Sequence, residues 1–257
     1  MQTFLEILQT VIDFIYFLIP YSSGEGKEKL EQIVAHRGWH SETLKENTLN
    51  SFSQALERGL WGIEFDVRWT QDHVPIICHD PNTSRVFGES VNIAETSLED
   101  LKKWIPEIPT LEEVVKQFGK KIHLFIELKE VNFEHRDIYK EKLIKILDNL
   151  TPGEDYHFLS LSMEPILNLD IVERQYYLLV GELNFLYLSE LAIKYQLGGI
   201  TGHYALLTSE LIKKHKMEGQ KVGTGFIRTK NLLYREKMRD VDFVFTNHPQ
   251  NLLNSLS

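Results

Sequence analysis

Short apolar runs alternate with helix-like stretches along this chain from residue 33 to residue 246. An apolar run of about four to eight residues between turn residues is typical of a buried strand. The predicted strands cover 33–37, 62–68, 122–128, 157–162, 176–180, 197–201, 221–226 and 242–246, and helical patterns cover 47–58, 110–118, 137–149, 164–173, 187–195, 208–218 and 230–238. Eight strands that alternate with helices favour an α/β fold, the closed parallel (β/α)₈ or TIM barrel.

Length and composition fit a single barrel and exclude several partners. The 257 residues match the usual size of this fold, and 42% hydrophobic with 25% charged residues is an ordinary globular composition. A formal net charge of −9 argues against nucleic acid, which needs a basic footprint. The single Cys78 excludes a disulfide framework and a thiolate zinc site within one chain, and it fits a cytoplasmic protein.

One segment interrupts the alternation and predicts a distortion of the barrel. Residues 74–79 follow the second strand after only the four-residue turn 70–73. So short a link cannot make a parallel crossover, and we therefore expect a hairpin above the barrel. Residues 81–109 then form a long stretch without a barrel strand, which suggests a small insertion over the site.

The N-terminal run over residues 4–20 is strongly apolar but carries Glu6, Gln9, Thr10 and Asp13 on one helical face. This pattern predicts an extra amphipathic helix, so we divide the chain into helix and linker (1–32) and barrel domain (33–257). The favoured interpretation is that the helix packs on the barrel. The alternative, a peripheral membrane contact through residues 4–20, is weakened by the acidic polar face.

Three carboxylates stand where strands of the predicted barrel end. Glu64 and Asp66 are two apart on one strand and point to the same face, and Glu127 ends the next barrel strand. The C-terminal strand ends of a barrel form one rim, so these acids should converge. Three close carboxylates repel one another unless a cation joins them, and all-oxygen ligation favours Mg²⁺ or Ca²⁺. Salt-bridged acids paired with Arg37 and Lys129 are the alternative.

Two histidines and two cations lie in the same stretches. His36 closes the first strand and His79 closes the hairpin, so the two can divide the roles of base and acid at a phosphodiester. Arg37 can grip a phosphate with its planar fork, and Lys129 can add a point charge. Two acids in these stretches each have two possible roles. Glu46 either holds Arg37 in place or favours a helix N-terminus. Asp80 either orients His79 or opens a turn.

The remaining histidines need no catalytic role. We interpret His40, His73, His123, His135, His157 and His215 as surface or structural residues, and the role of His203 stays open.

These residues resemble the ordered motifs of the glycerophosphodiester phosphodiesterase family. The matching segments are His36-Arg37-Gly38, Glu46-Asn47-Thr48, Ile63-Glu64-Phe65-Asp66-Val67, Thr70 with Asp72, His79-Asp80, Ser84-Arg85-Val86, Ile108-Pro109-Thr110-Leu111-Glu112-Glu113 and Glu127-Leu128-Lys129. The resemblance runs from about residue 33 to residue 250, and ends in Thr246-Asn247-His248-Pro249. Each motif alone is weak, but the ordered set is highly specific.

The resemblance implies a distorted barrel that hydrolyses glycerophosphodiesters to an alcohol and glycerol 3-phosphate with a divalent metal. It implies metal binding by Glu64, Asp66 and Glu127, acid/base roles for His36 and His79, and phosphate contact for Arg37 and Lys129. The substrate-binding set that we expect is Arg37, Lys129 and Glu46.

Two departures concern the pocket for the alcohol. Gly225 stands where such enzymes usually carry a tryptophan, and Asn247 replaces the aspartate of the terminal motif. A lysophospholipase D that acts on lysophospholipids is therefore one alternative function. A catalytically silent headgroup-binding barrel is another, although the intact His36, His79, Glu64, Asp66 and Glu127 argue against it.

Overall fold

The computed structural model describes residues 11, 12, 14, 15, 32–129 and 133–253, and within them nine strands form one sheet. The strands are β1 (Ile33–His36), β2 (Gly62–Trp69), β3 (Pro75–Ile77), β4 (His123–Leu128), β5 (Tyr156–Ser160), β6 (Tyr177–Gly181), β7 (Gly199–His203), β8 (Lys221–Gly225) and β9 (Phe243–Thr246). Each predicted barrel strand is present within about two residues of its expected bounds.

Eight parallel strands close into a barrel. The order is β1-β2-β4-β5-β6-β7-β8-β9, and β1 pairs with both β2 and β9. Ala35 lies opposite Ile63 on one side and Thr246 on the other, which is the register that closes the sheet. β3 pairs antiparallel with β2, so the predicted hairpin and the predicted (β/α)₈ class are both confirmed.

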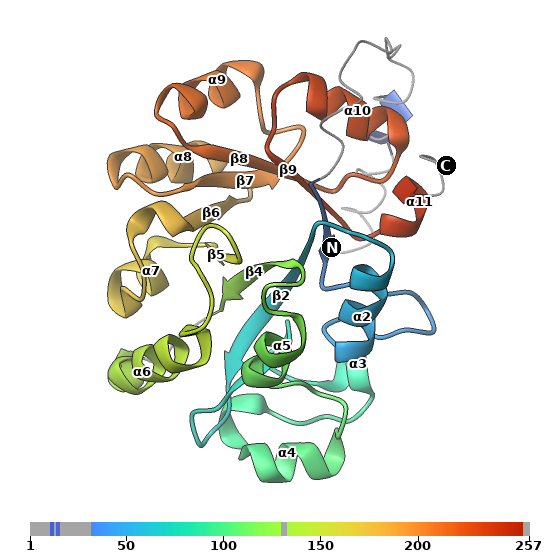
Figure 1. Ribbon diagram of the computed structural model, residues 1–257, viewed down its shortest axis with the longest axis vertical. Helices are drawn as coiled ribbons and strands as arrows, with labels where there is room; N and C mark the ends of the chain where they lie inside the picture. The colour runs from blue at the N-terminus through green and yellow to red at the C-terminus, as the bar shows by residue number, and fades with distance from the viewer. Residues whose placement is uncertain (1–10, 13, 16–31, 130–132, 254–257) are drawn as a thin grey trace.

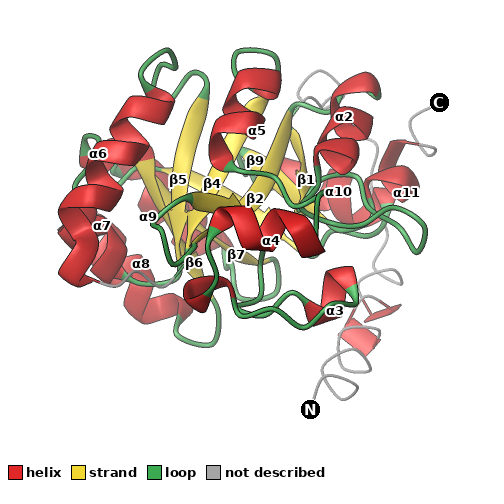
Figure 2. Cartoon of the chain, turned by 90° about the horizontal axis from the view of Figure 1, so that it is seen from below, coloured by secondary structure: helices red, strands yellow, loops and turns green. Residues whose placement is uncertain are grey.

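Helices surround the barrel (Figures 1 and 2). They are α2 (Leu49–Glu57), α3 (Ser84–Phe87), α4 (Leu98–Trp104), α5 (Leu111–Phe118), α6 (Arg136–Leu147), α7 (Met163–Leu169), α8 (Phe185–Lys194), α9 (Ser209–Met217), α10 (Lys230–Met238) and α11 (Pro249–Leu253). Threonine side chains cap several helix N-termini: Thr48 accepts from the backbone of Ser51, and Thr110 from that of Glu113. These caps satisfy amide groups that have no partner inside the helix.

Alternation along each strand divides its side chains between two cores. On β4, Leu124 and Ile126 join the large core between barrel and helices, whereas Phe125 joins the core inside the barrel. The inner core also contains Val34, Leu159, Leu178, Phe243 and Phe245. Because side chains alternate with period two, Glu127 on β4 points the same way as Phe125, into the barrel.

The insertion after β3 has a small core of its own. Ile76, Cys78, Ile93, Leu101, Ile105 and Ile108 form a separate buried cluster with Phe87, Val91 and Leu98 packed against it. This cluster holds α3 and α4, which lie in the lower part of Figure 1, with α4 at its lower edge and α3 beneath α2. The expected insertion over residues 81–109 is therefore a packed substructure.

Most of the predicted N-terminal helix and linker lies outside the described residues. Ile12 packs against the large core, while Val11, Phe14 and Ile15 are exposed. Among the described helices, none has the length and apolar character needed to cross a membrane.

Candidate active site

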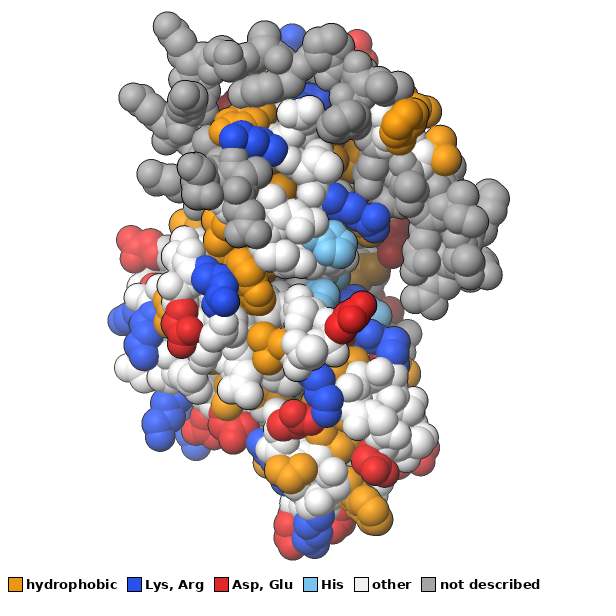
Figure 3. Space-filling model, turned by 90° about the vertical axis from the view of Figure 1, so that its right-hand side faces the viewer, with side chains coloured by type: hydrophobic (Ala, Val, Ile, Leu, Met, Phe, Trp, Pro, Cys, Tyr) orange, Lys and Arg blue, Asp and Glu red, His pale blue; other side chains and the backbone are white. Residues whose placement is uncertain are grey.

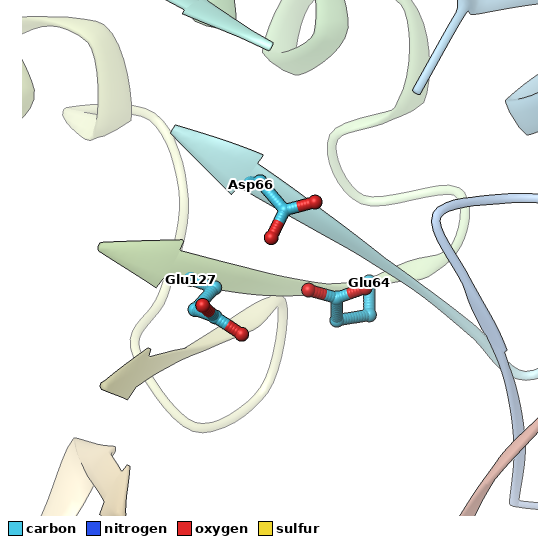
Figure 4. A group of neighbouring side chains, drawn as sticks. All are labelled: Glu64, Asp66 and Glu127. Carbon is cyan, nitrogen blue, oxygen red and sulfur yellow. The ribbon is translucent and has the colours of Figure 1, made fainter. Parts of the chain in front are cut away.

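Three carboxylates from β2 and β4 meet inside the mouth of the barrel, at the C-terminal ends of the strands. Glu64, Asp66 and Glu127 are all buried, and one oxygen from each lies within 4.8 Å of the others. Asp66 stands opposite Glu127 in the β2–β4 register, and Glu64 precedes it on the same face. Figure 4 shows the three side chains directed toward a common space. The sequence-predicted acids therefore converge.

The electrostatics of this group show the conflict that three buried acids create. Burial, reinforced by Asp66 and Glu127, raises the pKa of Glu64 well above its usual value, and burial with Asp66 raises the pKa of Glu127. Burial also opposes ionisation of Asp66, but Lys129 and Arg37 outweigh it and hold the pKa of Asp66 far below its usual value. The Lys129 ammonium lies 2.8 Å from Asp66 and also contacts Glu127.

The residues fit a hard divalent cation. The buried Glu64 Oε1 has no hydrogen-bond partner among the described residues, so one ligand oxygen is left over in the centre of the group. All three donors are carboxylate oxygens, which suit Mg²⁺, Ca²⁺ or Mn²⁺ better than thiophilic metals. A cation at this place would stabilise the ionised forms of Glu64 and Glu127.

A sharp turn after β1 places Arg37 against these acids. Arg37 has a left-handed backbone (φ 58°), and its N–H donates to Glu64 Oε2 at 3.1 Å. Its guanidinium lies 3.4 Å from Asp66 through Nε and donates to Glu46 at 3.0 Å through Nη1. Gly38 follows with φ 81°, where a Cβ would stand 2.5 Å from Ser51 Oγ, so only glycine completes this turn.

Two histidines flank the acids, and each is oriented through Nδ1. His36 Nδ1 lies 2.5 Å from Asn247 Oδ1, and its Nε2 lies 3.7 Å from Glu64. His79 Nδ1 lies 2.6 Å from Asp80 Oδ1. An oxygen acceptor requires Nδ1 to carry the proton, which leaves Nε2 as the other reactive position of each ring.

Burial lowers the pKa of both rings. Burial and Arg37 bring the pKa of His36 to about 4, and burial, with Arg37 and Lys129, lowers that of His79 despite Asp66 and Asp80. Burial therefore favours the neutral form of both imidazoles.

The structure shows the contacts behind the two open interpretations. Glu46 precedes the N-cap Thr48 and accepts a hydrogen bond from Arg37, which favours the interpretation that it holds Arg37. Asp80 contacts the His79 ring directly.

On the face seen in Figure 3, histidine side chains lie in a hollow edged by Lys, Arg, Asp and Glu side chains.

Sequence reasoning gave no role to three residues that the structure places at the site. Asn47, with φ 55°, donates from Nδ2 to Asp66 at 2.8 Å, and Arg85 contacts both Glu46 and Asp80. Asn247 was visible as a departure from a motif, but not as the partner of His36. His203 ends β7 opposite Gly225, and its ring lies 4.9 Å from that of Phe226.

A parallel barrel with a buried acidic triad and two oriented histidines at its mouth defines a class of barrel hydrolases. Residues 36–251 match the glycerophosphoryl diester phosphodiesterase family, and the chain belongs to that family.

Individual relatives agree with this assignment. The glycerophosphodiester phosphodiesterase of Caldanaerobacter subterraneus is 28% identical over 237 residues, which cover 86% of this chain and 96% of the relative. The human lysophospholipase D GDPD1 is 30% identical over 100 residues, covering 38% of this chain and 32% of that protein. An Oleispira antarctica phosphodiesterase, solved with its product sn-glycerol-3-phosphate, has a TM-score of 0.73 at 24% identity, over 88% of this chain and 96% of its own. This last likeness supports the fold.

Proposed function

We propose that this protein hydrolyses glycerophosphodiesters to an alcohol and glycerol 3-phosphate with the help of a divalent metal. The observation that carries the proposal is the meeting of Glu64, Asp66 and Glu127 with Arg37 and two oriented histidines at one barrel mouth. A structural acid cluster would not need two oriented imidazoles beside it. A phosphodiester needs all three parts: charge neutralisation, phosphate binding and proton transfer.

Glu64, Asp66 and Glu127 are the residues that would hold the metal, and Mg²⁺ or Ca²⁺ is the ion that their oxygens favour. When bound, the cation neutralises the acids and polarises the phosphate. Arg37 binds a phosphate oxygen while Glu46 holds its guanidinium in place, and Lys129 adds a second positive charge.

The histidines divide the proton transfers. One of His36 and His79 removes the proton from the attacking oxygen, which belongs to water or to a hydroxyl of the substrate. The other must hold a second proton, at Nε2, which the anionic phosphodiester beside the ring favours, and it gives this proton to the alcohol oxygen as the bond from that oxygen to phosphorus breaks. Both rings have Nε2 available for this role, because Nδ1 is engaged by Asn247 or Asp80.

A second candidate uses the same chemistry on lysophospholipids. Leu183, Leu206 and Phe226 are exposed on the loops after β6, β7 and β8, which are consecutive strands of the barrel mouth. An acyl chain can pack on such side chains, whereas a small polar ester gains little from them. The similarity of part of the chain to a human lysophospholipase D also supports this candidate activity.

The N-terminal unit of residues 1–32 would add a membrane contact to that activity, in a protein acting from the cytoplasm. Val11, Phe14 and Ile15 share one exposed apolar face at helical spacing, while Ile12 packs inward. Binding to phosphatidylcholine vesicles, compared between the full chain and a variant without residues 1–22, tests this contact. Equal binding by both proteins would rule it out.

One substrate panel tests the function. Glycerophosphocholine and lysophosphatidylcholine are offered with Mg²⁺, with Ca²⁺ and with EDTA, and glycerol 3-phosphate, lysophosphatidic acid and choline are measured. We expect metal-dependent choline release that EDTA abolishes. Binding of either ester without any turnover, under all ion conditions, would favour the silent headgroup-binding barrel instead.

A further inference from the structure

A chain of alternating charges runs from the acidic triad to His79. Asp66 contacts Arg37, Arg37 donates to Glu46, and Glu46 accepts a second hydrogen bond from Arg85 Nη2 at 2.7 Å. Arg85 Nε donates to Asp80 Oδ2 at 2.5 Å, and the other oxygen of Asp80 holds His79. Arg85 is thus the link between two acid–base pairs that otherwise lie on separate segments.

Arg85 reaches this place through the insertion. It lies on α3, and Phe87 at the end of the same helix packs on the insertion core of Ile76, Ile93 and Leu101. Thr83 also ties α3 to the following strand-like segment, donating to Glu89 O at 2.6 Å and accepting from Val91 N at 3.2 Å. The packing of the insertion therefore places Arg85 at the mouth of the barrel.

We propose that Arg85 is a positioning residue, which acts through Asp80 on His79 and through Glu46 on Arg37. This role rests on the proposed phosphodiester hydrolysis and assigns to the insertion a part in it. A guanidinium presents Nε and Nη2 along one rigid edge, so it can hold two carboxylates at a fixed separation. A flexible ammonium cannot reproduce that geometry.

Loss of Arg85 leaves Glu46 and Asp80 without their shared cation. Among the described residues, Glu46 then keeps its hydrogen bond with Arg37 and Asp80 its contact with His79, so the rotations of Arg37 and His79 are less restricted. Groups that orient a reacting residue or a metal ligand from behind typically contribute about 10- to 100-fold to activity. We expect Arg85→Met to lower kcat by that factor and Arg85→Lys to have an intermediate effect.

The kinetic test compares the loss of kcat caused by Arg85→Met in three genetic backgrounds. Arg85→Met is measured in the wild type, in His79→Ala and in Glu46→Gln. Arg136→Met is the control for loss of an exposed arginine, since the ion pair that Arg136 makes within the described residues is with its neighbour Asp137. If Arg85 acts through these residues, its substitution costs less in either background than in the wild type. The same factor in all three backgrounds overturns the proposal.

A second measurement does not depend on turnover. The charged groups that act on His79 are Asp66 and Asp80, which favour the imidazolium, and Arg37 and Lys129, which oppose it. Without Arg85, the carboxylate of Asp80 acts on His79 unshared, so the His79 titration followed by NMR should move to higher pH. It should stay in place in Arg136→Met.

The kinetic and titration measurements together distinguish failure of the positioning role of Arg85 from failure of the proposed function. An unmoved His79 titration in a folded Arg85→Met protein overturns the positioning role, whatever the substrate. A moved titration in a protein that hydrolyses no phosphodiester would instead overturn the proposed function and leave the link between Arg85 and His79 intact.

Discussion

The two ends of the barrel each hold a pair of histidines, and the two pairs differ in the groups that surround them. At the mouth, His36 and His79 stand beside buried carboxylates and Arg37. At the foot, His123 Nε2 lies 2.8 Å from His157 Nδ1, and His123 stacks on Trp61 with ring centroids 4.5 Å apart.

In the pair at the foot, both ring nitrogens of His123 are engaged in hydrogen bonds, so neither is available for proton transfer to a substrate. Its Nδ1 lies 2.8 Å from the carbonyl oxygen of Glu154, which can only accept, so Nδ1 carries the proton and Nε2 accepts from His157. Burial lowers the pKa of His123 to about 4 and that of His157 to about 3. Both are buried residues without a catalytic arrangement, which agrees with the structural role that the sequence analysis left open for them.

The comparison teaches that a shifted pKa does not mark an active site. His36 and His123 have pKa values lowered to about the same level by burial. What differs is the surroundings: carboxylates and cations at the mouth, aromatic rings and a carbonyl at the foot. β4 contributes to both, since His123 and Glu127 lie on the same face at opposite ends of one strand.

The largest effect should come from removing a carboxylate at the mouth. Glu127→Gln keeps the size of the side chain but removes a negative charge from the candidate metal site. Loss of the metal's role costs several kcal/mol of transition-state stabilisation, so kcat should fall by orders of magnitude. Excess Mg²⁺ or Ca²⁺ should restore it only in part. Wild-type turnover that survives chelation in Glu127→Gln would refute the metal site.

Truncating either mouth histidine should have the next largest effect. We expect His36→Ala and His79→Ala each to lower kcat by about 10²- to 10⁴-fold while the thermal melting temperature changes little. A poor leaving group should suffer more than an activated one in the variant that lacks the acid. If both leaving groups lose equally in both variants, the division of roles is wrong.

The side of the mouth away from the acids should control substrate choice. Within the described part of the chain, a Cβ at Gly225 would meet only Gly202 O, at 3.8 Å, so there is space for a larger side chain. Gly225→Trp adds an apolar wall, which should change discrimination by about tens to hundreds of fold. We expect kcat/KM for glycerophosphocholine to improve relative to lysophosphatidylcholine. An unchanged ratio in a folded variant would mean that Gly225 does not line the pocket.

The smallest effect on activity should come from the foot. His157→Phe leaves His123 Nε2 without its hydrogen bond and should cost about 1–3 kcal/mol of stability, with kcat unchanged. His157→Gln, which can still donate to His123, should cost less. A fall in kcat comparable to that of His79→Ala would erase the distinction between the two ends.

The foot pair also predicts a pH dependence with a definite sign. The pKa values of about 4 and about 3 lie below the ~6.5 of an unfolded histidine. The unfolded chain therefore binds more protons between about pH 3 and pH 6.5, and the free energy of unfolding falls as the pH drops through that window. Denaturant melts of wild type and His157→Phe at about pH 5 and about pH 7.5 should show a weaker pH dependence in the variant.

Much of this architecture could be predicted from the sequence because it depends on local periodicity. The eight strands follow from apolar runs, and the spacing of Glu64 and Asp66 places both carboxylates on one face whatever the surroundings. The hairpin followed from a turn too short for a crossover. The predicted helix over 4–20 lies mostly outside the described residues and stays a prediction.

Other contacts depended on closure of the barrel and on packing of the insertion. Asn247 meets His36 across 211 positions of sequence because β9 pairs with β1. Arg85 meets Glu46 across 39 positions because the insertion core carries α3 to the mouth. The sequence by itself determined which residue types end each strand and which face they occupy, because that follows from a period of two residues. Only the tertiary structure decided which of them touch, because register and long-range packing depend on the whole chain at once.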